Sequence, residues 1–359
     1  MSQTTLKQRR FQAMLATGVA LITMPPGGAF AAELNLPPIT VGAGVRTSFT
    51  HVDPENSDAD IDDFTLNSAR IYISGGVTEN ISLMLNTEYD ANGVAGRRSV
   101  DVIDAVAQFS FSDQFNVWVG RFLPPSDRAN LYGPYYASNW GVFIDGVQDG
   151  YVFETQGRDD GVMYWGQFGI AKVSFGVFDS PQTRGSSEVI YAGRVQLDFW
   201  DAENGYYLNG SYYGEKDLLA VGIAGQKIGG STSVTGDFLL EKKLGSGGVV
   251  TVEAEIADYE TPQGYVGGPP NNADSDGYYV LGAYLFPQVI GLGKFQALAK
   301  YGEATYKLLG GDEDLKTLEV NLNYIIKAQN ARIQLFYIDQ DRDFGSGGKQ
   351  IGLGLQVQI

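Results

Sequence analysis

The side chains that most often carry out chemistry are scarce in this sequence. It has one histidine, His51, and no cysteine. Nucleophilic catalysis needs a base aimed at a hydroxyl or thiol, and no G-x-S-x-G, P-loop or H-E-x-x-H motif is present. Glu253 and Glu255 stand two residues apart, which suits a charged strand face at least as well as glycoside hydrolysis. We therefore expect no enzymatic activity and no cofactor.

Charged residues recur instead at the polar positions of alternating segments. Such positions share one face of a strand, so their side chains form a wall that can compensate an ion stripped of part of its water. Four arginines fall on this face: Arg46, Arg70, Arg194 and Arg332. Seven acids fall on it as well: Glu88, Asp90, Asp104, Asp198, Glu253, Glu255 and Glu319. The excess of acids predicts a wall without strong preference for anions.

The segments that carry these residues alternate between apolar and polar positions. The last one shows this best, because apolar residues occupy every second position from Ile351 to Ile359. Alternation of this kind predicts strands and not helices, with Leu355 on an apolar face and Gln356 on a face toward water. The segments run about 9 to 12 residues, near the length that crosses hydrocarbon at a tilt.

The first residues are typical of a secretory signal peptide. Lys7, Arg9 and Arg10 precede an apolar stretch that is too short for a stable membrane-spanning helix, and Ala29-Phe30-Ala31 follows. We expect residues 1–31 to be removed and residues 32–359 to form one domain. Export by the general secretory route is the expectation, and a twin-arginine signal is the alternative.

The connections favour a membrane barrel. Short turns, such as residues 78–80, 245–248 and 327–329, alternate with longer polar loops, as in barrels whose short turns face the periplasm. The count of strands becomes about 16 when residues 205–217 are placed in an inner-side connection. We predict a transmembrane antiparallel β-barrel in the bacterial outer membrane, with a soluble β-sandwich as the alternative. The strands are expected to start near Ile39, Phe64, Ile81, Val100, Phe115, Asp160, Ala171, Glu188, Leu218, Thr232, Val249, Gly277, Phe295, Leu315, Ala331 and Gln350.

Several motifs resemble those of the phosphate-selective porin family, the outer-membrane porins O and P. The resemblance implies a barrel of about 16 strands, usually a homotrimer, with an infolded third loop that narrows a passive channel for small hydrophilic solutes or ions. The chain departs from the family at its last residue, Ile359, where an aromatic is usual, and has no lysine cluster after Arg121. The motifs are Gly120-Arg121-Phe122-Leu123-Pro124-Pro125, Gly193-Arg194-Val195-Gln196-Leu197-Asp198, Tyr212-Tyr213-Gly214-Glu215-Lys216-Asp217 and Gly236-Asp237-Phe238-Leu239-Leu240-Glu241-Lys242-Lys243.

Residues 123–157, which we call the constriction loop, are rich enough in aromatics and proline to fold inward as an ordered plug. The alternative is an outer loop that packs between subunits. When the barrel closes, Arg46, Arg70 and Arg332 fall on neighbouring strands with the last strand between them. The candidate residues for constriction and selectivity are Arg46, Arg70, Arg121, Asp127, Arg128, Asp145, Asp149, Arg194 and Arg332.

The expected partners are outer-membrane lipid, lipopolysaccharide and small hydrophilic solutes. A net charge of −17 argues against nucleic acid. The run Asp58-x-Asp60-x-Asp62 begins like a calcium loop but lacks the glycine and glutamate that an EF-hand requires, so we expect a solvated loop. Weak divalent-cation bridging to lipopolysaccharide is its alternative. A second function remains open, in which the barrel is a sleeve for a partner protein such as an electron-transfer cytochrome.

Overall fold

The computed structural model describes residues 38–57, 59–90, 99–147, 157–179, 189–260, 273–343 and 347–359, apart from the side chain of Asp90. The expected signal peptide therefore lies outside the described residues. No helix within the described ranges is long and apolar enough to cross a membrane. The described residues form one short helix, α1 (Arg128–Tyr136), and sixteen strands: β1 (Ile39–Pro54), β2 (Ile61–Gly76), β3 (Ile81–Asp90), β4 (Ser99–Ser112), β5 (Phe115–Phe122), β6 (Asp159–Phe168), β7 (Ala171–Phe178), β8 (Ile190–Asp198), β9 (Leu218–Ile228), β10 (Ser231–Lys243), β11 (Val249–Tyr259), β12 (Asp274–Ile290), β13 (Gly293–Leu308), β14 (Gly311–Lys327), β15 (Ala331–Arg342) and β16 (Gly348–Gln358).

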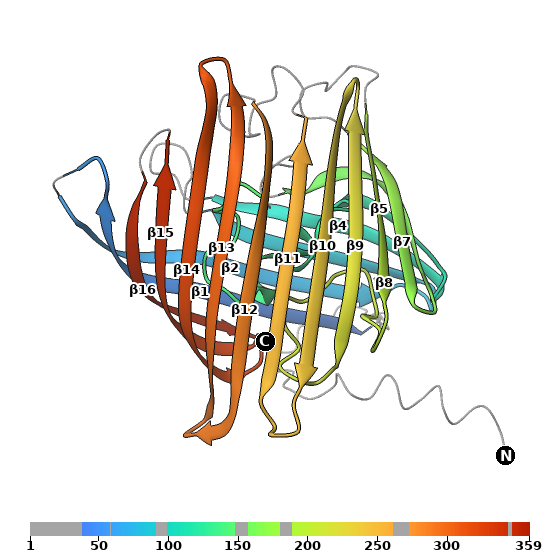
Figure 1. Cartoon of the computed structure of the whole chain (residues 1–359). Coiled ribbons are helices and arrows are strands. Elements are labelled where there is room, and N and C mark those ends of the chain that lie inside the picture. The colour runs from blue at the N-terminus through green and yellow to red at the C-terminus, as the bar shows by residue number, and fades with distance from the viewer. Residues whose placement is uncertain are drawn as a thin grey trace, which may run out of the picture. The chain divides into compact units, whose positions relative to one another are not determined.

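The strands form a closed antiparallel barrel, which confirms the predicted fold (Figure 1). Each strand pairs with its neighbours in sequence, and β1 pairs with β16 to close the wall. Closure leaves no unpaired strand edge, so the backbone groups of the wall are satisfied within it. All sixteen strands begin within four residues of the expected starts.

The two faces of the wall differ as the alternation predicts. On β16, Leu353 and Leu355 are 52% and 42% exposed, whereas Gln356 between Leu355 and Val357 is fully buried. Exposed valine, leucine, isoleucine and aromatic side chains recur around the outer face, where water would penalise them and hydrocarbon would not. A closed barrel with an apolar outside and a polar inside is built to sit in a membrane.

The connections on one side of the barrel are short except for one. Six of the inner-side connections have two to five residues, but residues 199–217 join β8 to β9. We call residues 199–217 the inner-side arm. Its position confirms that residues 205–217 do not form a wall strand. The described part of the constriction loop, between β5 and β6, carries α1.

Candidate functional site

The constriction loop folds into the barrel and is anchored by its own short helix. Asp127 caps α1, because its side chain accepts a hydrogen bond from the Asn130 backbone N–H at 2.8 Å. Gly133 has a φ of 61°, and Pro134 follows it, so the helix is kinked there. Nearly all residues from 123 to 147 are buried or half-buried. This part of the loop is therefore an ordered structure inside the barrel, packed against the inner face of the wall.

A row of basic side chains holds the end of α1 against the wall. Arg46 on β1 and Arg332 on β15 both lie opposite Gln356, so the three share one level. Arg332 donates a hydrogen bond to the Ala137 carbonyl. Arg46 donates to the Trp140 carbonyl at 3.2 Å, and its guanidinium lies 4.3 Å from the centre of the Trp140 ring. The two arginines thus bind the loop and do not line open water.

Acidic side chains of the wall also bind the loop. Glu319 accepts hydrogen bonds from the backbone N–H groups of Trp140 at 2.7 Å and Gly141 at 3.0 Å. Asp145 of the loop pairs with Lys300 of β13 at 2.6 Å. The Asp90 side chain lies outside the described part of the structure. We expected the other six inward acids to line a water-filled interior. They are instead at most 6% exposed, so they are buried in packed structure: Glu88, Asp104, Asp198, Glu253, Glu255 and Glu319.

Glycines on the inner wall provide seats for aromatic rings of the loop. A Cβ at Gly354 on β16 would collide with the Trp140 ring, and one at Gly44 on β1 would collide with the Tyr135 ring. Both glycines occupy inner positions, where any larger residue would push the loop away from the wall. Close packing therefore fixes the loop in addition to its hydrogen bonds.

Two buried arginine–carboxylate pairs lie beside the loop, and the wall pair is bonded to it: Arg194 donates to the Ser126 carbonyl at 3.2 Å, and Asp237 accepts from the Arg128 backbone N–H at 3.3 Å. Arg128 donates to Glu203 of the inner-side arm, with Nη1 and Oε1 3.0 Å apart, and both side chains are fully buried. Arg194 on β8 donates to Asp237 on β10, with Nη2 and Oδ1 2.8 Å apart. Burial opposes the charge of Glu203, but Arg128 outweighs it and lowers the pKa of Glu203 to about 2. The pair between arm and loop therefore remains charged across the physiological range.

Asp127 is a buried acid at the start of α1. Burial raises the pKa of Asp127 to about 7, although the hydrogen bonds from Asn130 oppose the rise. The nearby carboxylate of Asp237 adds to the rise, and Arg194 opposes it. This carboxyl group can therefore change its charge near neutral pH, inside the packed part of the interior.

The inner wall formed by β2, β3 and β4 is less covered. Its charges are paired along the wall: Arg70 with Glu88, and Arg158 with Asp104 at 3.5 Å. Asn86 donates to Asp104 at 2.9 Å. This wall thus offers tyrosine, amide and hydroxyl groups beside balanced ion pairs. Its half-exposed inner residues include Tyr72, Ser82, Met84, Asn86 and Gln108.

Two of the candidate residues are not placed at the constriction by the structure. Arg121 lies opposite Ala105 and Asp160, which are exposed on the outer face, and it pairs with Asp160 at 3.6 Å. The expected pore position for Arg121 therefore does not fit the register, because Trp118 and Phe122 take the inner positions of β5. Asp149 lies outside the described residues.

The structure brings in residues that the sequence did not single out. Lys172 of β7 donates to the Glu203 and Gly205 carbonyls at 2.8 and 2.9 Å. Arg158 stands just before β6, so alternation could not assign it to a face. The tyrosine-rich stretch from Tyr206 to Tyr213 was the available signal for a buried arm, because tyrosines in a turn this long need a surface to pack on.

The only histidine lies away from this interior. His51 is near the outer end of β1, where its Nδ1 is 2.9 Å from Asp62. Within the described ranges, no three histidine, aspartate or glutamate side chains are grouped so that they could hold a metal ion. Asp58 of the predicted solvated loop lies outside these ranges.

Solved structures of outer-membrane channels share this architecture. OmpF of Salmonella typhi, in complex with daunomycin, matches with a TM-score of 0.61 and 12% identity, over 90% of this chain and 98% of that chain. The outer membrane channel DcaP of Acinetobacter baumannii matches with a TM-score of 0.59 and 12% identity, over 91% and 99%. An anion-selective porin from Comamonas acidovorans matches with a TM-score of 0.56 and 14% identity, over 90% and 99%.

At these identities the similarity is one of fold. No protein-family profile and no curated protein matches the sequence. The chain has the fold of bacterial outer-membrane porins. With its apolar outer face, the barrel belongs in the bacterial outer membrane.

Proposed function

We propose that this protein is a porin, a passive water-filled channel for small hydrophilic solutes or ions. The main support is a closed barrel whose polar interior is narrowed by a firmly anchored loop, while the β2–β4 wall keeps half-exposed polar groups. Passive flow needs such a path, with groups that bind a solute weakly enough to release it.

The candidate residues then divide into two roles. Arg70, beside the β2–β4 path, acts on passing ions directly, and its pairing with Glu88 weakens any preference for anions. The others set the width of the channel by holding the constriction loop in place: Arg46, Asp127, Arg128, Asp145, Arg194 and Arg332. We expect a channel that is weakly cation-selective or nearly unselective, without the phosphate selectivity of the resembling family.

The test is conductance in planar lipid bilayers, with the reversal potential measured in a potassium chloride gradient. Stepwise insertions with a reversal potential near zero, or of the sign for cations, are the expected result. Purified barrel that inserts into the bilayer and carries no current would contradict the porin assignment. Block by phosphate at low concentration would instead restore the phosphate-selective reading.

We propose further that the protein works as a homotrimer, contacts lipopolysaccharide, has no enzymatic activity and loses residues 1–31 on export. The alternative of a sleeve for a partner protein has less support, because the constriction loop and the inner-side arm occupy the interior that a partner would need. Cross-linking in native outer membranes distinguishes a trimer from a complex with another protein.

A further inference from the structure

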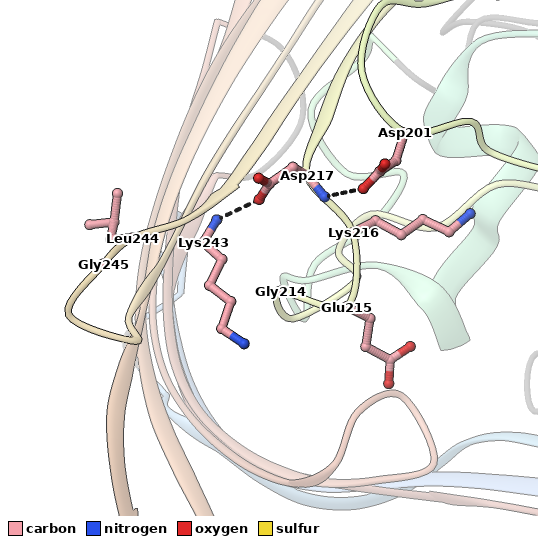
Figure 2. A pocket seen from close by; sticks show the side chains of 8 residues that line it. All are labelled: Asp201, Gly214, Glu215, Lys216, Asp217, Lys243, Leu244 and Gly245. Atoms are coloured by element: carbon pink, nitrogen blue, oxygen red, sulfur yellow. Dashed lines mark hydrogen bonds between the residues drawn. The ribbon is translucent and has the colours of Figure 1, made fainter.

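The inner-side arm starts from a fixed base at the ends of β8 and β9. The Asp217 backbone N–H donates to the Asp201 side chain at 2.8 Å, and the Lys243 backbone N–H donates to the Asp217 side chain at 3.0 Å (Figure 2). A shallow hollow of about 390 Å³ lies beside this base, with Glu215 and Lys216 along it (Figure 2). The ends of the arm are therefore held together, and its middle is free to fold elsewhere.

The middle of the arm folds against the constriction loop. The Leu208 backbone N–H donates to the Leu131 carbonyl at 3.3 Å, and the Gly210 N–H donates to the Tyr136 carbonyl at 3.0 Å. Leu208 is 2% exposed. Together with the buried Arg128–Glu203 pair, these bonds make loop and arm one packed unit. A turn that served only to connect two strands would need none of them.

Two tyrosines of this unit border the β2–β4 wall. Tyr207 of the arm is half-buried, and its ring centre lies 5.6 Å from that of Trp118, the residue opposite Gln108 of β4. Tyr136, the last residue of α1, is 39% exposed. The ring centre of the preceding residue, Tyr135, lies 5.0 Å from the Arg70 guanidinium and 6.3 Å from the Tyr72 ring centre, so this end of α1 lies on the β2 side. The two rings thus lie toward opposite edges of the less covered wall.

We infer that the inner-side arm is a second arm of the constriction and that Tyr207 limits the width of the water path along β2–β4. The inference rests on the proposed porin function and adds a size-determining residue to it. The loop narrows the water path from the β2 side, and the arm narrows it from the β4 side. Solutes then pass between two tyrosine rings and a wall of balanced charge.

Single-channel conductance tests the role of Tyr207. Tyr207→Ala removes the ring and should raise conductance beyond the spread among wild-type channels. The matched control is Tyr191→Ala on the outer face of β8, where Tyr191 is 58% exposed, and its conductance should equal that of the wild type. If Tyr207→Ala inserts normally and conducts like the wild type, the arm lies outside the path and the inference fails.

A thiol probe gives a second readout that does not depend on a change in packing. The chain has no cysteine, so Tyr207→Cys creates a single reactive site. A methanethiosulfonate reagent should lower the current through Tyr207→Cys channels and leave Tyr191→Cys channels unchanged. Absence of any effect on Tyr207→Cys, in channels that conduct, would overturn the inference. Failure of the porin function itself is distinguishable, because the wild type would then carry no current.

Discussion

The inner wall of the barrel has two unlike parts. From β5 through β16 and on to β1, inner side chains are packed beneath the loop and the arm, and Arg332 and Gln356 are fully buried. Along β2–β4, Asn86 and Gln108 remain half-exposed. The two parts have the same strand alternation, so alternation cannot be the source of the difference.

Loop coverage is what separates the two parts. The packed part offers glycines such as Gly44 and Gly354, against which aromatic rings lie, and charged groups that the loop neutralises. The β2–β4 part offers Tyr72 and Met84 in inner positions, and the Tyr135 ring of the loop meets Tyr72 edge-on, with the ring centres 6.3 Å apart, and does not lie against bare backbone there. An inward charged side chain therefore interacts with passing ions where it is uncovered, and it holds the constriction loop where the loop covers it.

The largest expected effect is a loss of stability when a charge pair in the packed part is broken. Arg128→Ala leaves Glu203 buried and unpaired, and removal of one partner of a buried pair costs about 3 to 5 kcal/mol. Lys242→Ala removes a half-exposed partner of Asp217 and should leave stability nearly unchanged. Urea unfolding in detergent, followed by tryptophan fluorescence, measures both. Equal urea midpoints for the two variants would mean that water reaches the Arg128–Glu203 pair and that the pair is not buried.

Arginine substitutions on β16 come next and test both faces. Leu355→Arg places a charge in hydrocarbon, at a cost of about 2 to 4 kcal/mol near the bilayer midplane. Alternation alone places Gln356 toward water, where an arginine would stay hydrated, but Gln356 is fully buried and accepts a hydrogen bond from Arg332 at 2.8 Å. We therefore expect both variants to fold poorly into lipid vesicles. Normal folding of Gln356→Arg would show that the packed side chains around Gln356 rearrange at little cost in free energy.

Filling a glycine seat should change conductance more than stability. Gly354→Val pushes the Trp140 ring off the wall and shifts the constriction loop into the path, so conductance should fall. Gly282→Val on β12 is the matched control, because an added Cβ there meets no atom within 4 Å. Bilayer recordings of the two variants make the comparison. Wild-type conductance in Gly354→Val channels would argue that the loop does not set the channel width.

The smallest expected effect is a pH dependence. Because burial raises the pKa of Asp127 to about 7, its contribution to stability is complete below its ordinary pKa of 3.8 and is lost as pH rises through about 7. Arg194, Asp237 and Glu255 face it from β8, β10 and β11. Asp127→Asn keeps a good helix cap and removes the charge. The melting temperature of the wild type should drop more between pH 5 and pH 8 than that of Asp127→Asn. Parallel curves would contradict this.

The sequence by itself determined the barrel and its strands. Period-two alternation is a local property, and the same period sets which face each side chain takes, so strand starts and the facing of Leu355 and Gln356 follow from it. The assignment of residues 205–217 to the inner side also followed, because an even strand count required it.

Only the tertiary structure decided which inward residues meet water. Glu319 and Gln108 both occupy inner positions in the alternating pattern. The constriction loop, which is distant from Glu319 in sequence, covers Glu319 and binds it through its backbone, whereas Gln108 remains half-exposed. Arg121 stands outside the pore because the register of β5 fixes its face, and Glu203 gained its role from a contact with Arg128 across 75 positions. Such contacts depend on how loops fold back into the closed barrel, and no local period encodes that.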